Sequence, residues 1–506
     1  MTDQPAAFIR RDLVPQRPAP VITTGVIGFA RTRLFNSFSN GLLTIVSVLL
    51  MWVFIAPAVK FLLLDAVWQG TDRNACLAEN AGHTVGACWP FIHAKLAQFI
   101  YGFYPEAERW RVNLTFLLAA VLLLPLLIPR VPAKSLNAGL FFIAFPIVAY
   151  FLLHGGGIHG FGVSWIADIA LGIANAIVDS GRRLIELGAA RGGIGIVLVG
   201  LGYALVGLGS ALAVPILPLT WLRDAIQASG QAVWLDLVLT AVIVSGLLFW
   251  LNGAFRTGWG ALTVSLATFV GIGLVVGVLG LDHGGLPIVD TRQWGGLLVT
   301  LVVSVTGIVT SMPIGIALAL GRRASIPLIR VFSVIFIEFW RGVPLITVLF
   351  FATYMLPLFL PGNFTVDGLV RVLIGVALFS GAYNAEVIRG GLQAIPRGQG
   401  EAASALGMSY WKTTGLVVMP QALRHVIPGL VNSFIALFKD TTLVLIVAIF
   451  DLLGSLRASF ADPNWATPTT LFTGFAFAGL IYFTFCFSMS RYSLFVEHRL
   501  NAHRRN

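Results

Sequence analysis

The chain has 506 residues, of which 57% are hydrophobic and only 11% are charged. Soluble proteins carry about 25% charged residues, so this composition excludes a water-soluble globule. The net charge of +11 comes from arginines in short links between apolar runs, which is typical of cytoplasmic loops rather than of a nucleic-acid-binding surface. We therefore predict an all-α, polytopic transmembrane helical bundle, since a spanning helix needs roughly 20 apolar residues and many such runs occur.

Residues 1–154 predict a basic arm followed by three spans. The arm, residues 1–40, is rich in arginine and is placed in the cytoplasm. The first apolar run follows this polar arm and lacks a small-residue cleavage site, so no cleavable signal peptide is expected. The region 41–154 then contains a polar loop at 63–111, expected outside the cytoplasm, and three spans at about 42–62, 112–129 and 137–154.

Two of the three cysteines, Cys76 and Cys88, lie in this loop, whereas Cys486 lies in an apolar run. If the loop faces an oxidising compartment, Cys76 and Cys88 can form a disulfide bond. Two free thiols are the alternative, and the sequence does not decide between them.

The block 155–281 predicts further spans. Its first part, 160–181, is only moderately apolar and contains Asp168 and Asp179. It is either a fourth span or an amphipathic helix at the membrane interface. Counting it as a span keeps the arginine-rich links of the block in the cytoplasm, so we favour the span. Clear spans follow at about 193–219, 233–251 and 258–281.

Between residues 290 and 490 the apolar runs are separated by ordered polar motifs. The second run is interrupted at Arg341-Gly342-Val343-Pro344, where proline disfavours a continuous helix. With the earlier spans the total is about 12 (11–12), and the arginine-rich tail 491–506 lies in the cytoplasm. The five spans predicted in this region are at about 295–320, 327–358, 366–388, 413–437 and 469–489.

Residues 393–420 form a polar segment between two of these spans. Pro396 can start a short helix, and the alanines of the segment are slim helix formers that let it lie close to a partner. Gly407 can end that helix with a left-handed cap, and Ser409 can cap the next one. This composition indicates a docking element for a partner outside the bilayer; an ordinary helix–turn–helix loop is the alternative.

The spacing Glu401-Ala402-Ala403, then Gly407 and Pro420, resembles the signature of the integral-membrane subunits of bacterial ABC importers. Flanking motifs sharpen the match: RGVPL at 341–345, GAYNAEVIRG at 381–390, RGQGEAASALG at 397–407, PQALRHVIPGLVNSF at 420–434 and KDTTL at 439–443. Together they resemble the polar-amino-acid uptake (histidine/glutamate/glutamine) permease family. The first span and the cysteine loop resemble the long permease subunits of general L-amino-acid or glutamate/glutamine/aspartate/asparagine transporters. Residues 155–281 look like an insertion relative to the usual members.

By this resemblance, residues 290–490 are the ABC importer transmembrane domain, with a coupling helix at 393–410 that docks on a separate ATPase subunit. Movement of this helix would drive alternating access and carry L-amino acids from periplasm to cytoplasm. The residues implied in ATPase coupling are Gln399, Glu401, Ala402, Ala403, Gly407 and Pro420.

The chain itself has no G-K-[ST] phosphate-binding motif, because none of its five lysines follows a glycine. We therefore expect a transport subunit rather than an enzyme. It would bind no cofactor of its own, and ATP and Mg would bind the ATPase partner.

The resemblance also implies the partners: an ABC ATPase dimer, a second homologous permease in a heterodimer, a periplasmic solute-binding protein and the lipid bilayer. No nucleic-acid partner is expected, and the implied location is the bacterial inner membrane. An ion-coupled secondary amino-acid transporter is the alternative. It would have pseudo-symmetric halves, and no strong internal repeat joins the two halves of this sequence.

Charged residues within apolar runs are costly and therefore informative. The amino acid's carboxylate and ammonium groups need polar partners, which broken helices can supply. The structural alternative is that Glu386 pairs with Arg389, and Lys439 with Asp440. The histidines show no metal-ligand spacing, so neither a metal site nor a catalytic group is expected. The candidates for the substrate path are Glu386, Asn432, Lys439, Asp440 and Thr441.

Overall fold

The computed structural model describes residues 28–77, 79, 84–132, 134–158, 160–190, 195–251, 258–359 and 366–501. Most of the predicted arm and the end of the predicted tail lie outside the described residues. Within them the regular structure is helical, and the four β-bridges are isolated residue pairs rather than strands. The prediction of an all-α fold is confirmed.

Ten of the described helices are long and apolar enough to cross a membrane, and a bent helix pair makes eleven. This confirms the polytopic bundle. The prediction of about 12 spans also counted α12 (Gly258–Val278), an apolar helix of 21 residues that is not among the ten. The region predicted to hold five spans contains the bent pair and four long helices, at Gly296–Gly321, Gly368–Ala394, Tyr410–Val447 and Thr470–Leu500.

The chain forms two compact units. Unit 1 consists of residues 1–97 and 455–488, and unit 2 of residues 98–454 and 489–506. The helices that contribute to unit 1 include α2 (Phe38–Val59), α4 (Trp89–Tyr101) and α22 (Thr470–Asn501).

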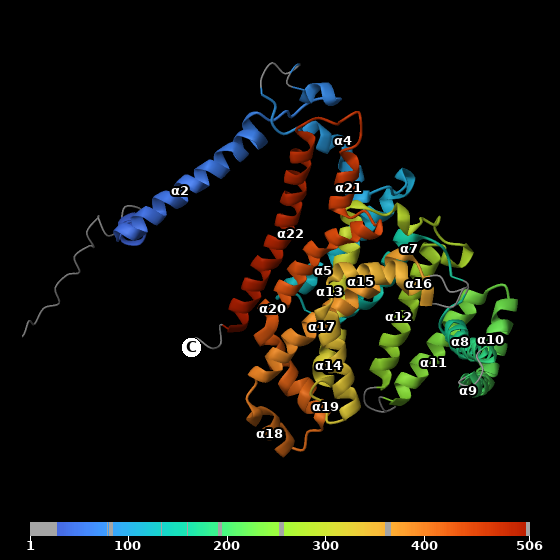
Figure 1. The fold of residues 1–506 in the computed structure, drawn as a ribbon. Coiled ribbons are helices and arrows are strands. Elements are labelled where there is room, and N and C mark those ends of the chain that lie inside the picture. Colours follow the sequence, from blue (N-terminus) through green and yellow to red (C-terminus); the bar gives the residue numbers. More distant parts are fainter. Residues whose placement is uncertain are drawn as a thin grey trace, which may run out of the picture. The chain divides into compact units, whose positions relative to one another are not determined.

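Helix α2 of unit 1 (Figure 1) is made almost entirely of apolar residues, which lie on all its sides. The hydroxyl of Ser37 accepts a hydrogen bond from the N–H of Asn40 and so caps its first turn. None of the residues in its most apolar stretch is buried within the described chain. A helix that is hydrophobic on every face and has no core to enter is suited to a lipid environment.

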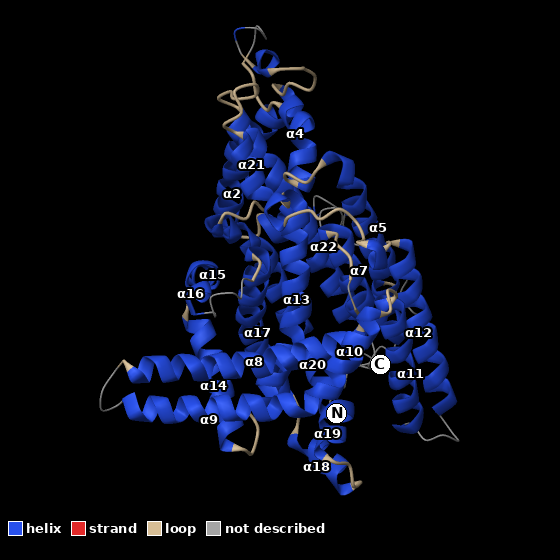
Figure 2. Cartoon of the chain, turned by 90° about the vertical axis from the view of Figure 1, so that its right-hand side faces the viewer, coloured by secondary structure: helices blue, strands red, loops and turns tan. Residues whose placement is uncertain are grey.

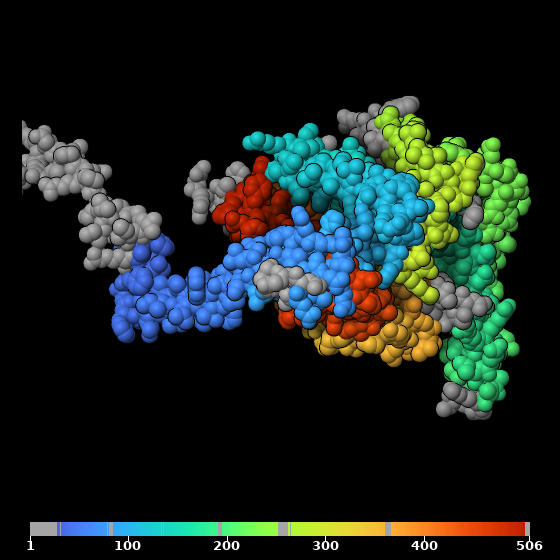
Figure 3. All heavy atoms as spheres, turned by 90° about the horizontal axis from the view of Figure 1, so that it is seen from above, coloured from blue at the N-terminus to red at the C-terminus, as the bar shows by residue number. Residues whose placement is uncertain are grey.

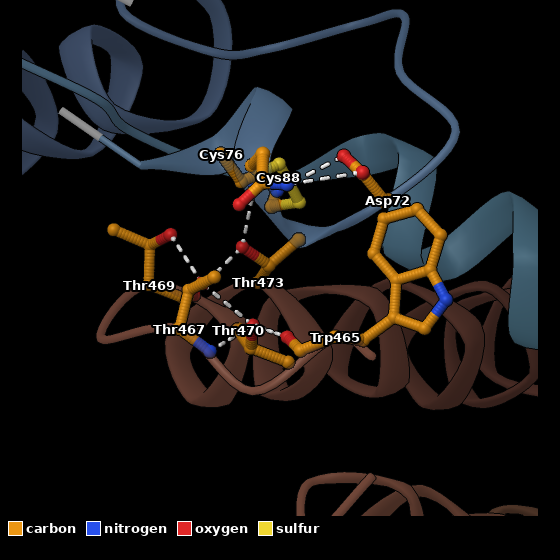
Figure 4. The surroundings of a disulfide bond; sticks show 9 residues. Asp72, Cys76, Cys88, Trp465, Thr467, Thr469, Thr470 and Thr473 are labelled. Carbon is orange, nitrogen blue, oxygen red and sulfur yellow. Dashed lines mark hydrogen bonds between the residues drawn. A yellow bond between two sulfur atoms is a disulfide. The ribbon is translucent and has the colours of Figure 1, made fainter. Parts of the chain in front are cut away.

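The polar loop between α2 and α4 is fixed to the start of α22 within unit 1. Cys76 and Cys88 form a disulfide bond, and the Cys88 N–H donates to the hydroxyl of Thr473 at 2.9 Å (Figure 4). The Lys95 ammonium lies 2.5 Å from the Asp462 carboxylate, and its hydrogen bond lowers the pKa of that carboxyl below its usual value. The disulfide-bonded alternative for the two cysteines is therefore the one that the structure contains.

Three helices form the centre of unit 2: α13 (Gly296–Gly321), α17 (Gly368–Ala394) and α20 (Met419–Asp440) (Figure 1). Small residues let these helices pack closely. A Cβ atom on Gly391 of α17 would lie 2.7 Å from the carbonyl oxygen of Ala422 on α20. A Cβ atom on Gly315 of α13 would lie 3.1 Å from the backbone nitrogen of Ala385 on α17. A larger side chain at either glycine would therefore push the helices apart.

The bent pair of unit 2 joins α14 (Pro327–Gly342) to α15 (Leu345–Phe350) at an angle of 103°. Pro344 explains the bend, because its ring lacks an N–H donor and keeps the preceding residue out of the helical conformation. Val343 is accordingly extended, with φ −103° and ψ 133°. The interruption predicted at residues 341–344 is confirmed.

A lateral group of helices in unit 2 is formed by α8 (Gly162–Ala189), α9 (Gly195–Ala213), α10 (Leu217–Ala228), α11 (Ala232–Leu251) and α12. It lies to one side of α13 and α17 (Figure 1), and its green atoms are at the right-hand side of Figure 3. Glycines seven residues apart let α8 and α9 pack closely: Gly188 of α8 faces the Gly195 carbonyl oxygen, at 2.6 Å from an added Cβ. The two helices run crosswise to α11 and α12 (Figure 2).

Helix α8 is capped by a residue of another helix. The carboxylate of Asp236, on α11, accepts hydrogen bonds from the N–H groups of Phe161 at 2.7 Å, Val163 at 3.0 Å and Ser164 at 3.1 Å. These N–H groups at a helix start have no partner within the helix, and the helix dipole favours negative charge there. Asp236 is completely buried, so this cap fixes the direction in which α8 leaves α11.

Candidate functional site

A short helix, α18 (Arg397–Ala405), lies beyond the ends of α17 and α20 (Figure 1). It begins directly after Pro396, as the sequence predicts. It ends in a Schellman motif: the Gly407 N–H donates to the Ser404 carbonyl at 2.9 Å, and the Met408 N–H donates to the Ala403 carbonyl at 3.2 Å. Gly407 has φ +74°, the left-handed conformation that glycine adopts without a Cβ penalty.

One face of α18 packs inward and the other is exposed. Ala403 is buried, with 4% of its surface exposed, whereas Glu401, Ala402 and Gly407 are exposed. Leu406 is 83% exposed at the tip of the segment. Leu406 thus presents its apolar side chain away from the bundle, beside the exposed Gly407.

Two glutamine side chains link α18 to α20. The side-chain amide of Gln421 donates to the Gln399 side-chain oxygen at 3.3 Å and to the Val417 carbonyl at 2.9 Å. Pro420 occupies the first turn of α20, where its missing N–H is not needed. Ser409 precedes the following helical turn as predicted, but its hydroxyl makes no capping bond there. The predicted side-chain cap is therefore wrong.

Three of the candidate substrate-path residues lie where α20 ends and η13 (Thr441–Val447), a 3-10 helix, begins. Lys439 is exposed and Asp440 is half-buried. In the part of the chain that the structure describes, no ion pair joins these two residues, so the pairing considered as an alternative is absent there. The buried hydroxyl of Thr441 donates to the Phe438 carbonyl at 2.8 Å. Asn432 lies seven residues before Lys439, which places both on one face of α20.

The fifth candidate, Glu386 on α17, is held by arginines. Its carboxylate pairs with the guanidinium of Arg389 on the same helix and lies 3.4 Å from Arg322 Nη1, just after α13. The pairing of Glu386 with Arg389, considered as the structural alternative, is thus present. The link to Arg322 was not predicted, because the apolar pattern places these residues 64 positions apart without indicating contact.

A buried polar contact between α13 and α17 was also missed. The side-chain amide of Asn384, which is 1% exposed, donates to the Ser311 hydroxyl at 2.9 Å. Hydrogen bonds of this kind hold membrane helices together. The available signal was the presence of two polar residues, Asn384 and Glu386, within a largely apolar run.

The part of the chain that contains these elements matches a known family. Residues 311–502 match the family described as "Binding-protein-dependent transport system inner membrane component". This stretch begins within α13 and includes α18 and α20.

Two relatives match nearly the whole chain. It is 36% identical over 490 residues to the inner membrane amino-acid ABC transporter permease protein YhdY of Escherichia coli (strain K12), covering 97% of both chains. It is 38% identical over 504 residues to the glutamate/glutamine/aspartate/asparagine transport system permease protein BztC of Rhodobacter capsulatus, covering 99% of both. The chain therefore belongs to the amino-acid ABC transporter permeases, a family of multi-pass inner-membrane proteins, and the resemblance stated from its motifs is confirmed.

A shorter relative matches only part of the chain. The probable glutamine ABC transporter permease protein GlnP of Bacillus subtilis (strain 168) is 34% identical over 197 residues, which are 39% of this chain and 88% of that protein. The long architecture is thus shared with YhdY and BztC, whereas GlnP corresponds to a single portion of it.

Proposed function

We propose that this permease subunit couples ATP hydrolysis by a separate ATPase subunit to amino-acid entry by alternating access. The observation that carries the proposal is α18, a short helix with slim exposed residues that joins α17 to α20 at one end of the bundle. A partner that pushes α18 would move both long helices together. Gln399, Glu401, Ala402, Ala403, Gly407 and Pro420 are the residues we assign to this coupling contact.

The partners we assign are an ATPase dimer, a second permease and a periplasmic solute-binding protein. The family description, a binding-protein-dependent transport system, supports the last of these. ATP and Mg would be bound by the ATPase, since none of the lysines of this chain lies in a G-K-[ST] motif.

The substrate class we assign is L-amino acids, with glutamate, glutamine, aspartate and asparagine as the first to test, as in the printed name of BztC. Asp440 and Lys439 are of opposite charge and lie at a helix break, where an ammonium and a carboxylate group could each find a partner. Asn432 extends this polar face by about 10 Å along α20, at 1.5 Å per residue. Thr441 would act at its margin, whereas the fifth candidate, Glu386, is engaged by Arg389 and Arg322.

Uptake by proteoliposomes tests the proposal. The chain alone is expected to give no uptake under an ion gradient or with ATP. The complete complex, with ATPase, second permease and solute-binding protein, is expected to take up amino acids only when ATP is present. Ion-driven uptake by the chain alone would establish the secondary transporter instead.

A further inference from the structure

Five charged side chains from α14, α17 and the end of α13 form a cluster in unit 2. They are Arg322, Glu338, Arg341, Glu386 and Arg389, and we call them the charge cluster. Arg322 follows α13, while the other four lie on α14 and α17. With three guanidinium groups and two carboxylates, the cluster has a net charge of +1.

Arg322 is the centre of the charge cluster. Its Nη1 atom lies 3.1 Å from Glu338 Oε1 on α14 and 3.4 Å from Glu386 Oε2 on α17. One guanidinium group therefore joins three helices. Arginine suits this role, because it is always charged and presents several donors in a fixed plane.

The charge cluster also holds α14 at its bend. Arg341, the penultimate residue of α14, lies 4.0 Å from Glu338 and places its guanidinium group 5.8 Å from the centre of the Tyr383 ring on α17. A cation over an aromatic face is attracted to it. The contact ties the end of α14, where the chain turns by 103°, to α17.

Helix α17 connects the charge cluster to α18. Glu386 lies eight residues before Ala394, where α17 ends, which is about 12 Å along the helix at 1.5 Å per residue. Only Ile395 and Pro396 separate α17 from α18. A displacement of α18 therefore reaches the charge cluster through a single rigid helix.

We propose that the charge cluster transmits the movement of α18 to the bend between α14 and α15, so that α13, α14 and α17 move as one body. Glu386 and Arg322 are then positioning residues that make no contact with the amino acid. This inference rests on the proposed function, and it assigns Glu386 to force transmission in place of the substrate path.

The test uses the complete transporter in proteoliposomes, with uptake and ATP hydrolysis measured in the same vesicles. Glu386→Gln and Arg322→Gln are each expected to lower uptake at saturating amino acid about fivefold or more, the size of typical coupling effects between sites. ATP hydrolysis is expected to stay within about twofold of the unmodified complex, and the half-saturating amino-acid concentration to stay unchanged. The double variant is expected to lose no more than the worse single variant, because both remove the same link.

Asp168→Asn is the matched control. Asp168 on α8 pairs with Arg223 on α10 at 2.5 Å, which is also an ion pair between helices but lies in the lateral group. This variant is expected to keep the normal ratio of uptake to hydrolysis. Recovery of the complex by affinity purification shows that each variant assembles. Arg341 is a more peripheral member of the charge cluster, so Arg341→Gln is expected to lower uptake less than the other two cluster variants do.

Three results would overturn the inference. A raised half-saturating concentration with an unchanged ratio of uptake to hydrolysis would make Glu386 a substrate contact. Unchanged kinetics in all cluster variants, or losses that multiply in the double variant, would also refute the link. Failure of the unmodified complex to show any ATP-dependent uptake would instead contradict the proposed function, so the two failures are distinguishable.

Discussion

At the scale of single residues, Gly407 has two properties that can be separated. Its φ of +74° favours glycine for conformational reasons, yet a Cβ atom added there would meet no heavy atom of this chain within 4 Å. Any steric demand for a small residue must therefore come from outside the chain. An aspartate in the left-handed conformation costs only about 1–2 kcal/mol, too little to unfold the bundle.

We expect Gly407→Asp to abolish coupling without preventing membrane insertion. A steric and electrostatic cost of about 1.4 kcal/mol or more at the ATPase contact would lower uptake by about tenfold or more. The measurement is ATP-dependent uptake by the reconstituted complex, normalised to the amount of permease in the vesicles. The matched control is Gly230→Asp, because Gly230 has a φ of +72° and equally open surroundings but follows α10 in the lateral group. Retained uptake in Gly407→Asp, or equal loss in both variants, would contradict a coupling role for Gly407.

The residues that sequence reasoning missed are those whose partners come from distant helices. In the sequence, Asp236 is a single charged residue at the start of an apolar run, and the neighbouring residues do not indicate that it caps α8. Arg322 reads as an ordinary arginine after a span, although it bridges Glu338 and Glu386. Such pairings depend on how the helices pack, whereas the Pro344 break and the Gly407 cap follow from local backbone chemistry and were predictable.

At the scale of elements, the direction of α8 helps to decide whether the first helix of the block 155–281 spans the membrane or lies along its surface. Helix α8 is long and apolar enough to span, which fits the prediction made for residues 160–181. However, α8 and α9 run crosswise to α11 and α12 (Figure 2), and α8 exposes Asp179 and Arg182. These features favour the alternative of an amphipathic helix along the membrane surface.

Single-cysteine labelling distinguishes the two arrangements. In a Cys486→Ser background, we expect Asn175→Cys, in the middle of α8 and on the same face as Asp179, to react rapidly with a charged maleimide, because an interfacial helix keeps its polar face in water. Leu247→Cys on α11 is the control and is expected to stay unlabelled, since Leu247 is 52% exposed on a helix suited to span the lipid. Labelling of Asn175→Cys as slow as that of Leu247→Cys would support α8 as a buried span.

At the scale of the whole molecule, the sequence pattern sufficed for the class of fold, since long apolar runs in a bilayer leave few options besides helices. The sequence pattern did not predict how the chain divides into two compact units. Residues 455–488 belong with residues 1–97 in unit 1, so a boundary drawn along the sequence at 290–490 crosses from one compact unit to the other. The cause is long-range contact: Asp462 with Lys95, and Thr473 with Cys88.

The subunit composition of the assembled transporter can also be predicted. We expect one copy of this chain per transporter, paired with a different permease, by analogy with the long amino-acid systems that it resembles. When two differently tagged copies are co-expressed with the other subunits, purification through one tag is expected to recover the second permease and the ATPase but not the other tagged copy. The mass of the purified complex provides a second check, because each added copy contributes 54.4 kDa. Recovery of both tags in equal amounts would show a homodimer, in which every transporter carries two lateral groups and two charge clusters.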